Sequence, residues 1–304
     1  GVIGKLSLKF TNFSMANLFR KNDNYRGFIP QGDGQTMTLS AQTNGTYYQS
    51  YNISFFDPWF GGKRPNSFSV SAFYSVQTDV SSNYYNSAYM NNYYNYYGGY
   101  GSYYNNYYNN YESYYDPDKS IQMYGAAIGW GKRLRWPDDY FTLSAELSFQ
   151  RFILKDWSYL YIKLNNGEYM SSGNCNNFSL GLTLSRNSTD NPIFPRRGSE
   201  FTASVRLTPP YSLFSDKDYK TYGQDNYEEA ASVYNWVEYH KWKFKARTYT
   251  ALTDGQKCPV IMTRAEFGLL GHYNKYKKSP FETFYMGGDG MTGYSTSYAS
   301  ETIA

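Results

Sequence analysis

Few side chains in this sequence could act as acids, bases, nucleophiles or metal ligands. His240 and His272 are the only histidines, and neither has a partner at a spacing that would hold a metal ion. A histidine beside serine and aspartate can serve a hydrolase, but both residues are so common here that such a match is uninformative. We expect His272 to be a polar residue at the base of a loop. The sequence therefore predicts no enzyme, no bound cofactor and no metal site.

The most regular charged motif is a row of cations at every second position between residues 241 and 247. It consists of Lys241, Lys243, Lys245 and Arg247, separated by Trp242, Phe244 and Ala246. Since successive side chains of a strand point to opposite faces, the cations share one face and the apolar residues the other. The motif requires a strand whose faces meet different surroundings. The net charge of +4 is small and does not indicate nucleic-acid binding.

The same two-residue alternation recurs in about ten segments of the chain. They are centred near residues 7, 40, 52, 72, 126, 146, 181, 204, 244 and 265. Each spans roughly 9 to 15 residues, as tilted membrane strands do, whereas strands of a soluble sandwich usually have about five or six. No apolar run reaches the roughly 18 residues that a spanning helix needs. The pattern predicts an all-β protein, a transmembrane antiparallel β-barrel.

The connections between these segments give the barrel an orientation. From the third strand onward, short turns near 57–66, 132–139, 187–199 and 252–259 alternate with long loops near 79–119, 155–176, 209–233 and 273–304. Outer-membrane barrels have short periplasmic turns and longer outer loops. The first connection, about 12–35, is long and the second, near 45–47, is short, so these two depart from the pattern. We expect a missing strand upstream, and either a closed ten-stranded barrel or, as we favour, the middle of a larger one.

In such a barrel the cation row must face the lumen, because cations at mid-depth on the lipid face cost about 2–4 kcal/mol each. Two interpretations remain open: a pore wall that attracts anions, or a solvated wall whose cations pair with Glu146, Glu200 and Glu266. We favour the second. The topology also places Cys175 at the end of an outer loop and Cys258 in a periplasmic turn, which predicts no disulfide.

Three further motifs have a distinctive composition. One turn reads Asp57, Pro58, Trp59 and Phe60, a second contains Asp190, Pro192, Pro195, Arg196, Arg197 and Gly198, and the final loop begins with Phe284, Tyr285, Gly287 and Gly288. Proline and glycine are typical of turns, and aromatic residues suit a membrane interface. In this order the motifs resemble those of the BamA family of outer-membrane assembly barrels, and the likeness covers nearly the whole chain.

The resemblance implies a sixteen-stranded barrel preceded by POTRA domains, in the bacterial outer membrane. Residues 1–304 would then be a partial barrel domain, approximately strands 2 to 11 plus the start of an inward-folded loop. It implies that the protein folds and inserts nascent outer-membrane proteins by strand templating at a lateral seam. Implied partners are accessory outer-membrane lipoproteins or surface proteins, the lipid bilayer and lipopolysaccharide, with no nucleic acid. A polypeptide-secretion transporter of the same superfamily and a passive porin are the alternatives.

The stretch from 79 to 119 is rich in Tyr and Asn and resembles versions of the loop found in Bacteroidetes-type bacteria. Its position predicts a large extracellular loop with both ends fixed by strands. It is either a flexible insertion, or a cap or docking surface for an extracellular accessory protein. We predict that deletion of 84–115 leaves the barrel folded.

Overall fold

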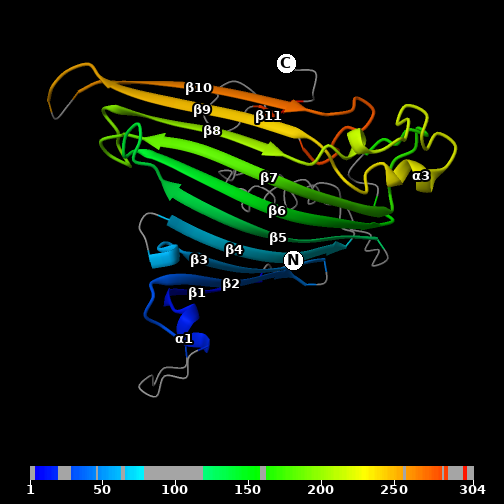
Figure 1. Ribbon diagram of the computed structural model, residues 1–304, viewed down its shortest axis with the longest axis horizontal. Helices are drawn as coiled ribbons and strands as arrows, with labels where there is room; N and C mark the ends of the chain where they lie inside the picture. Colours follow the sequence, from blue (N-terminus) through cyan, green and yellow to red (C-terminus); the bar gives the residue numbers. More distant parts are fainter. Residues whose placement is uncertain are drawn as a thin grey trace, which may run out of the picture.

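The computed structural model describes residues 4–19, 29–45, 47–62, 66–78, 119–157, 162–255, 258–282, 284–286 and 297–299. Ten long strands form one antiparallel sheet in chain order (Figure 1). They are β1 (Gly4–Phe13), β2 (Gln35–Asn44), β3 (Tyr48–Asp57), β4 (Asn66–Thr78), β5 (Ser120–Arg133), β6 (Phe141–Lys155), β7 (Gly173–Asn187), β8 (Gly198–Leu207), β9 (His240–Ala251) and β10 (Val260–Gly271). The alternating pattern thus predicted every one of them.

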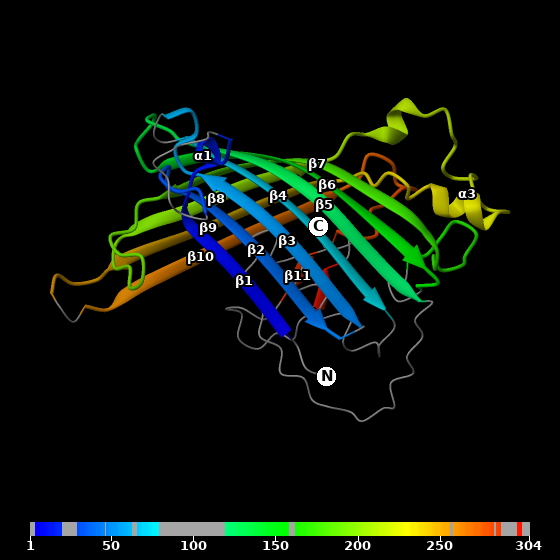
Figure 2. The ribbon, with the colours of Figure 1, turned by 90° about the horizontal axis from the view of Figure 1, so that it is seen from below.

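The sheet curves into an arch, with β1 and β10 at its two edges (Figure 2). Each of these edge strands has a single neighbour within the described residues, so the ten strands do not close on each other as one of our two hypotheses required. No helix in the described part of the chain is long and apolar enough to span a membrane.

In the middle of the sheet, the register separates an apolar convex face from a polar concave face. On the convex face, Trp130, Ala145 and Leu182 lie side by side across β5, β6 and β7. The adjacent residues Gly129, Glu146 and Gly181 form the neighbouring row on the concave face. Since a shift of one residue would exchange these two sets, the alternation in the sequence fixes the register.

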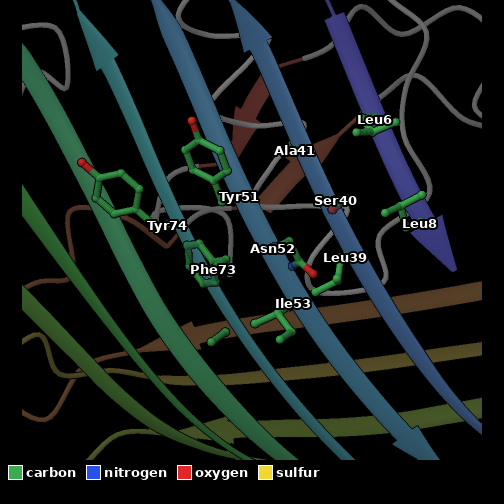
Figure 3. A pocket seen from close by; sticks show the side chains of 11 residues that line it. Leu6, Leu8, Leu39, Ser40, Ala41, Tyr51, Asn52, Ile53, Phe73 and Tyr74 are labelled. Carbon is green, nitrogen blue, oxygen red and sulfur yellow. The ribbon is translucent and has the colours of Figure 1, made fainter. Parts of the chain in front are cut away.

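Convex-face residues of the first strands surround an apolar hollow of about 490 Å³. Its rim includes Leu6 and Leu8 of β1 together with Tyr51 of β3 and Tyr74 of β4 (Figure 3). The hydroxyl groups of both tyrosines point toward the end of the sheet at which β1 starts. An apolar body with a polar tip suits a position near the headgroups of a lipid layer.

The connections gather at two ends of the arch, as the sequence predicted. The short-turn end carries the β3–β4, β5–β6, β7–β8 and β9–β10 turns, together with the long first connection, which contains α1 (Met15–Phe19). The long-loop end carries η2 (Tyr211–Phe214) and α3 (Tyr227–Ser232) between β8 and β9. A further short helix, η1 (Phe60–Gly62), follows β3 at the short-turn end. None of these four helices was predicted, because segments of three to six residues show no helical period.

A hydrophobic core fills the concave side at the long-loop end. Phe152 and Cys175, from β6 and β7, are completely buried there. Loop residues cover them, and the largest buried members are Trp157, Met170 and Tyr239. Loops therefore pack against the inner wall of the barrel rather than extending freely from its rim.

A separate two-stranded sheet follows β10 in the chain. It pairs β11 (Phe284–Met286) with β12 (Ser297–Ala299), and Figure 2 shows β11 on the concave side of the arch. The chain therefore turns into the lumen after β10.

Candidate functional site

The candidate site is the concave wall of β5–β10 together with residues 272–282, which we call the inward segment. The cations predicted to face the lumen lie on this wall, since Lys241 pairs in register with Arg206 and, through Gly181, belongs to the row of Glu146. The apolar residues between the cations face the other way, and Trp242 and Phe244 are 46% and 41% exposed on the convex side.

Two of the three carboxylates proposed as partners of the cation row do pair with it. Nη1 of Arg247 lies 3.0 Å from Oε1 of Glu200, and Nζ of Lys245 lies 3.7 Å from Oε1 of Glu266. The third assignment was wrong, because Glu146 pairs at 3.1 Å with Arg206, a cation of β8 that is outside the row. Arg206 on β8 lies one strand nearer to Glu146 than Lys241 on β9 does, and only Gly181 stands between Arg206 and Glu146 in the row.

Lys241 instead pairs with a carboxylate of the inward segment. Its Nζ atom lies 2.7 Å from Oε2 of Glu282, and the two side chains are only 8% and 1% exposed. Next to this pair, the ring of Phe281 stacks on Phe152 of β6, with centroids 4.4 Å apart and planes within 7°. A charged contact and an aromatic contact therefore hold the end of the inward segment against the wall. Low exposure makes the charged contact stronger than one in water.

A second buried ion pair joins the inward segment to the β8–β9 loop. Lys277 Nζ lies 3.9 Å from Oε2 of Glu238, whose side chain is fully buried and also accepts a hydrogen bond of 2.8 Å from the Ser212 backbone N–H. The ammonium of Lys277 lies 5.2 Å from the ring centre of Tyr219. Burial lowers the pKa of Lys277, and the negative charge of Glu238 opposes that shift.

A hollow of about 370 Å³ opens in the wall beside the Arg206–Glu146 pair. It exists because the concave positions here are small: Ser67, Ser69, Gly129, Gly131 and Gly181. The combination of missing side chains and a paired carboxylate gives a polar recess that faces the lumen.

The turn that contains Asp190 is held together by that carboxylate. Its Oδ1 atom accepts hydrogen bonds from the backbone N–H groups of Arg196, at 2.9 Å, and Arg197, at 3.2 Å. These bonds lower the pKa of Asp190. The two arginine side chains then reach the next turn, where Arg197 pairs with Asp254 and Arg196 donates to the carbonyl of Gly255 at 3.2 Å. The motif thus links two short turns.

Three other members of this turn have conformational roles. Pro192 and Pro195 lie in the part of the turn between Asp190 and the two arginines whose backbone N–H groups it binds. Gly198 is the first residue of β8 and has a φ of 108°. A side chain at Gly198 would collide with the backbone of Ser188 and Thr189, so glycine is required there.

The turn after β3 is built in a similar way. Asp57 accepts a hydrogen bond of 2.8 Å from the Trp59 backbone N–H and another of 3.0 Å from the Gln35 side chain. Phe60 stacks on Phe68 of β4, with ring centres 4.7 Å apart. Trp59 and Phe60 remain 40% and 46% exposed, consistent with the predicted interfacial belt, and Pro58 lies between Asp57 and Trp59.

The remaining sequence candidates fall at other places. Phe284 and Tyr285 lie in β11, and Gly287, Gly288 and nearly all of the loop at 79–119 lie outside the described residues. His272 directly follows β10. Cys175 is within β7 rather than in the preceding loop, Cys258 is in the β9–β10 turn, and both are free thiols. Among the described residues no three His, Cys, Asp or Glu side chains cluster as a metal site would require.

Sequence reasoning did not identify Glu238, Phe281 or Glu282 as parts of the site. All three lie in irregular segments, where no period reveals which side chain turns inward. The only available indication was the position of Phe281 and Glu282 immediately before the motif that starts at Phe284.

Known proteins resemble the chain in sequence pattern and in fold. The family model for the Omp85 superfamily domain matches residues 31–303. The crystal structure of BamA from Haemophilus ducreyi lacking POTRA domains 1–3 is similar over 86% of this chain and 40% of that one, with a TM-score of 0.53 and 18% identity. The chain thus spans well under half of the structure it matches. No curated protein sequence matches it significantly.

Proposed function

The chain belongs to the Omp85 superfamily of bacterial outer-membrane β-barrels, and on that premise we propose that it is part of an assembly factor that folds and inserts other β-barrel proteins. The superfamily supports the wider class, an assembly or transport protein of the outer membrane. The BamA-like fold supports the narrower proposal of an insertase.

The chemistry of this proposed activity is non-covalent. An unpaired strand cannot enter lipid, because each free backbone N–H or C=O group costs several kcal/mol there. A barrel with a weakly paired seam offers the edge of one strand as a template, so that the incoming strand exchanges water for backbone hydrogen bonds. No cofactor and no titrating side chain is needed for that exchange.

The observation that carries the proposal is the placement of the inward segment. The Lys241–Glu282 pair and the Phe281–Phe152 stack hold it on the lumenal wall, and a hydrophobic core with Trp157 and Tyr239 fills the same end. A passive porin needs a continuous aqueous channel. A lumen occupied by packed loops suits a protein whose activity lies in its wall.

The proposed partners follow from the activity. They are nascent outer-membrane proteins as clients, lipid and lipopolysaccharide around the convex face, and accessory lipoproteins or surface proteins at the two ends. The exposed apolar residues of the convex face, including Trp242 and Phe244, support the contact with lipid.

A reconstituted folding assay tests the proposal. The full-length protein is placed in phospholipid vesicles, and a urea-denatured small β-barrel protein is added. We expect the client to fold several times faster than in empty vesicles, as followed by its heat-resistant band on gels. Equal rates in both vesicles would reject an insertase, and uptake of the client into the vesicle interior without membrane insertion would indicate the secretion transporter instead.

A further inference from the structure

Two large apolar side chains are exposed at the tip of the β8–β9 loop. Leu213 and Phe214, the last residues of η2, are 67% and 84% exposed. Figure 2 shows η2 as the short yellow-green helix that stands on the convex side of the arch at the long-loop end. That is the side on which the strands meet lipid.

Two backbone hydrogen bonds and one ring contact fix the conformation of η2. The backbone N–H of Ser212 donates a hydrogen bond of 2.8 Å to the buried carboxylate of Glu238, and the N–H of Leu213 donates to the carbonyl of Pro210 at 3.0 Å. The ring of Tyr211 packs on Trp236, with centroids 5.2 Å apart. Because its backbone is bonded and its first ring is packed, η2 holds Leu213 and Phe214 outward rather than leaving them free to fold back.

A chain of aromatic side chains runs from the lipid-facing wall to the residues just before η2. On β9, Trp242 is 46% exposed on the convex face and donates through Nε1 to Nδ1 of His240 at 3.1 Å. The ring of His240 lies 5.4 Å from that of Tyr273, whose hydroxyl donates to the carbonyl of Thr208 just before η2. These contacts link the lipid-facing wall at Trp242 to Thr208, which precedes η2 in the same loop as Leu213 and Phe214.

Charge does not select the ligand of this tip. The residues that follow η2 are two acids and two bases, Asp216, Lys217, Asp218 and Lys220, and all four are exposed. Their charges balance, so the apolar pair determines what η2 can bind.

We propose that η2 is a membrane anchor that inserts Leu213 and Phe214 among the acyl chains of the outer leaflet. Interfacial segments bury their apolar face about 5–10 Å into the boundary between headgroups and acyl chains. The anchor ties the β8–β9 loop, and through Glu238 and Lys277 the inward segment, to the lipid around the barrel. This inference requires the outer-membrane location but not the insertase activity.

Depth-dependent fluorescence quenching tests the anchor. The full-length protein carries Cys258→Ser to remove the partly exposed thiol, while Cys175 is completely buried and does not label. Leu213→Cys and Phe214→Cys are each labelled with an environment-sensitive dye, in vesicles of phosphatidylethanolamine and phosphatidylglycerol. Asp225→Cys, on an exposed part of the same loop, is the matched control.

We expect blue-shifted emission at 213 and 214, and strong quenching by lipids that carry a spin label on the acyl chain close to the headgroup. The dye at 225 should show neither effect. Quenching by aqueous iodide at all three positions would overturn the proposal, since it would place the tip in water. A dye at 214 that is shielded from iodide but is not quenched by lipid would also overturn it, because a protein would then cover the tip. The heat-resistant band on gels verifies that each variant is folded.

Discussion

Lys241 on β9 and Glu282 of the inward segment form an ion pair of 2.7 Å that is almost completely removed from solvent. The wall contains four other cation–carboxylate pairs within the described residues, Arg206–Glu146, Lys245–Glu266, Arg264–Glu266 and Arg247–Glu200, and all of them are more exposed. Exposed pairs typically contribute about 0–1 kcal/mol, whereas a buried charge that loses its partner is strongly destabilising. The position of the inward segment therefore depends on the Lys241–Glu282 pair more than on any of these exposed pairs.

Lys241→Met is expected to release the inward segment from the wall. The substitution leaves the carboxylate of Glu282 buried without its cation, and removing one member of a buried pair costs about 3–5 kcal/mol. The exposed residues Lys275 and Lys278 of the segment should then be cut faster by trypsin in the folded protein. Mass spectrometry of the fragments measures the rate at each site.

Lys245→Met is the matched control, because Lys245 lies on the same strand as Lys241, but the side chains of its pair with Glu266 on β10 are 56% and 38% exposed. We expect no change in cleavage at Lys275 or Lys278 for this variant. The double variant Lys241→Met with Glu282→Leu should recover most of the resistance, since no charge is left buried. If trypsin cleaves Lys241→Met at Lys275 and Lys278 as slowly as it cleaves the wild type, the Lys241–Glu282 pair does not hold the segment.

Gly125→Ala is expected to destabilise the wall by about 1–3 kcal/mol through overpacking. A methyl group at Gly125 on β5 would lie 2.9 Å from the ring of Phe73 and too close to the carbonyl of Phe149. Gly181→Ala on β7 is the control, because its methyl group would meet its nearest neighbour at an ordinary 3.7 Å. The urea concentration at which the folded band disappears should fall for Gly125→Ala alone, and an equal fall for both would contradict the explanation.

The Asp190 turn should loosen in acid. Its folded-state pKa is lowered by hydrogen bonds from the backbone N–H groups of Arg196 and Arg197, so the stabilisation is present above the ordinary value of 3.8 and is lost as the pH falls below it. Hydrogen exchange at the amides of residues 196 and 197 measures this as a lower protection factor in acid. In Asp190→Asn, which keeps a neutral acceptor, the protection should be weaker and independent of pH. A pH dependence that persists in this variant would assign the effect to another group.

Cysteine labelling tests the orientation of the barrel. Cys258 is partly exposed in the β9–β10 turn, and Cys175 is completely buried. A small maleimide that enters the periplasm should modify only Cys258, and a large polymer-linked maleimide should modify neither thiol in intact cells. Lys220→Cys, in the β8–β9 loop, should react with the large reagent in intact cells. Reaction of Cys258 with that reagent would place the short-turn end outside.

The sequence was most informative where the chain alternates. All ten strands, their faces and the two ends of the arch could be predicted, because a strand between lipid and water imposes a period of two on its side chains. Cross-strand partners such as Lys245 and Glu266 follow from the same rule. The pairing of Glu146 with Arg206 was missed because only the cations of the row on β9 were considered as partners, although Arg206 on β8 lies one strand nearer to Glu146.

The loops were predictable only in length. Trp157, Tyr239 and Glu238 are buried in irregular segments whose contacts come from parts of the chain far apart in sequence. The partner of Lys241 lies 41 residues away in such a segment, so no local spacing could indicate it. Long-range packing determines these contacts, and alternation cannot reveal it.

Depletion of the protein in its own cells tests the proposed activity most directly. The abundance of several unrelated outer-membrane β-barrel proteins is measured as the protein disappears, with outer-membrane lipoproteins as the control. An insertase predicts that folded barrel proteins fall together while their unfolded precursors accumulate in the periplasm, and that the lipoproteins are unchanged at first. Normal assembly of the other barrels after depletion would contradict the account.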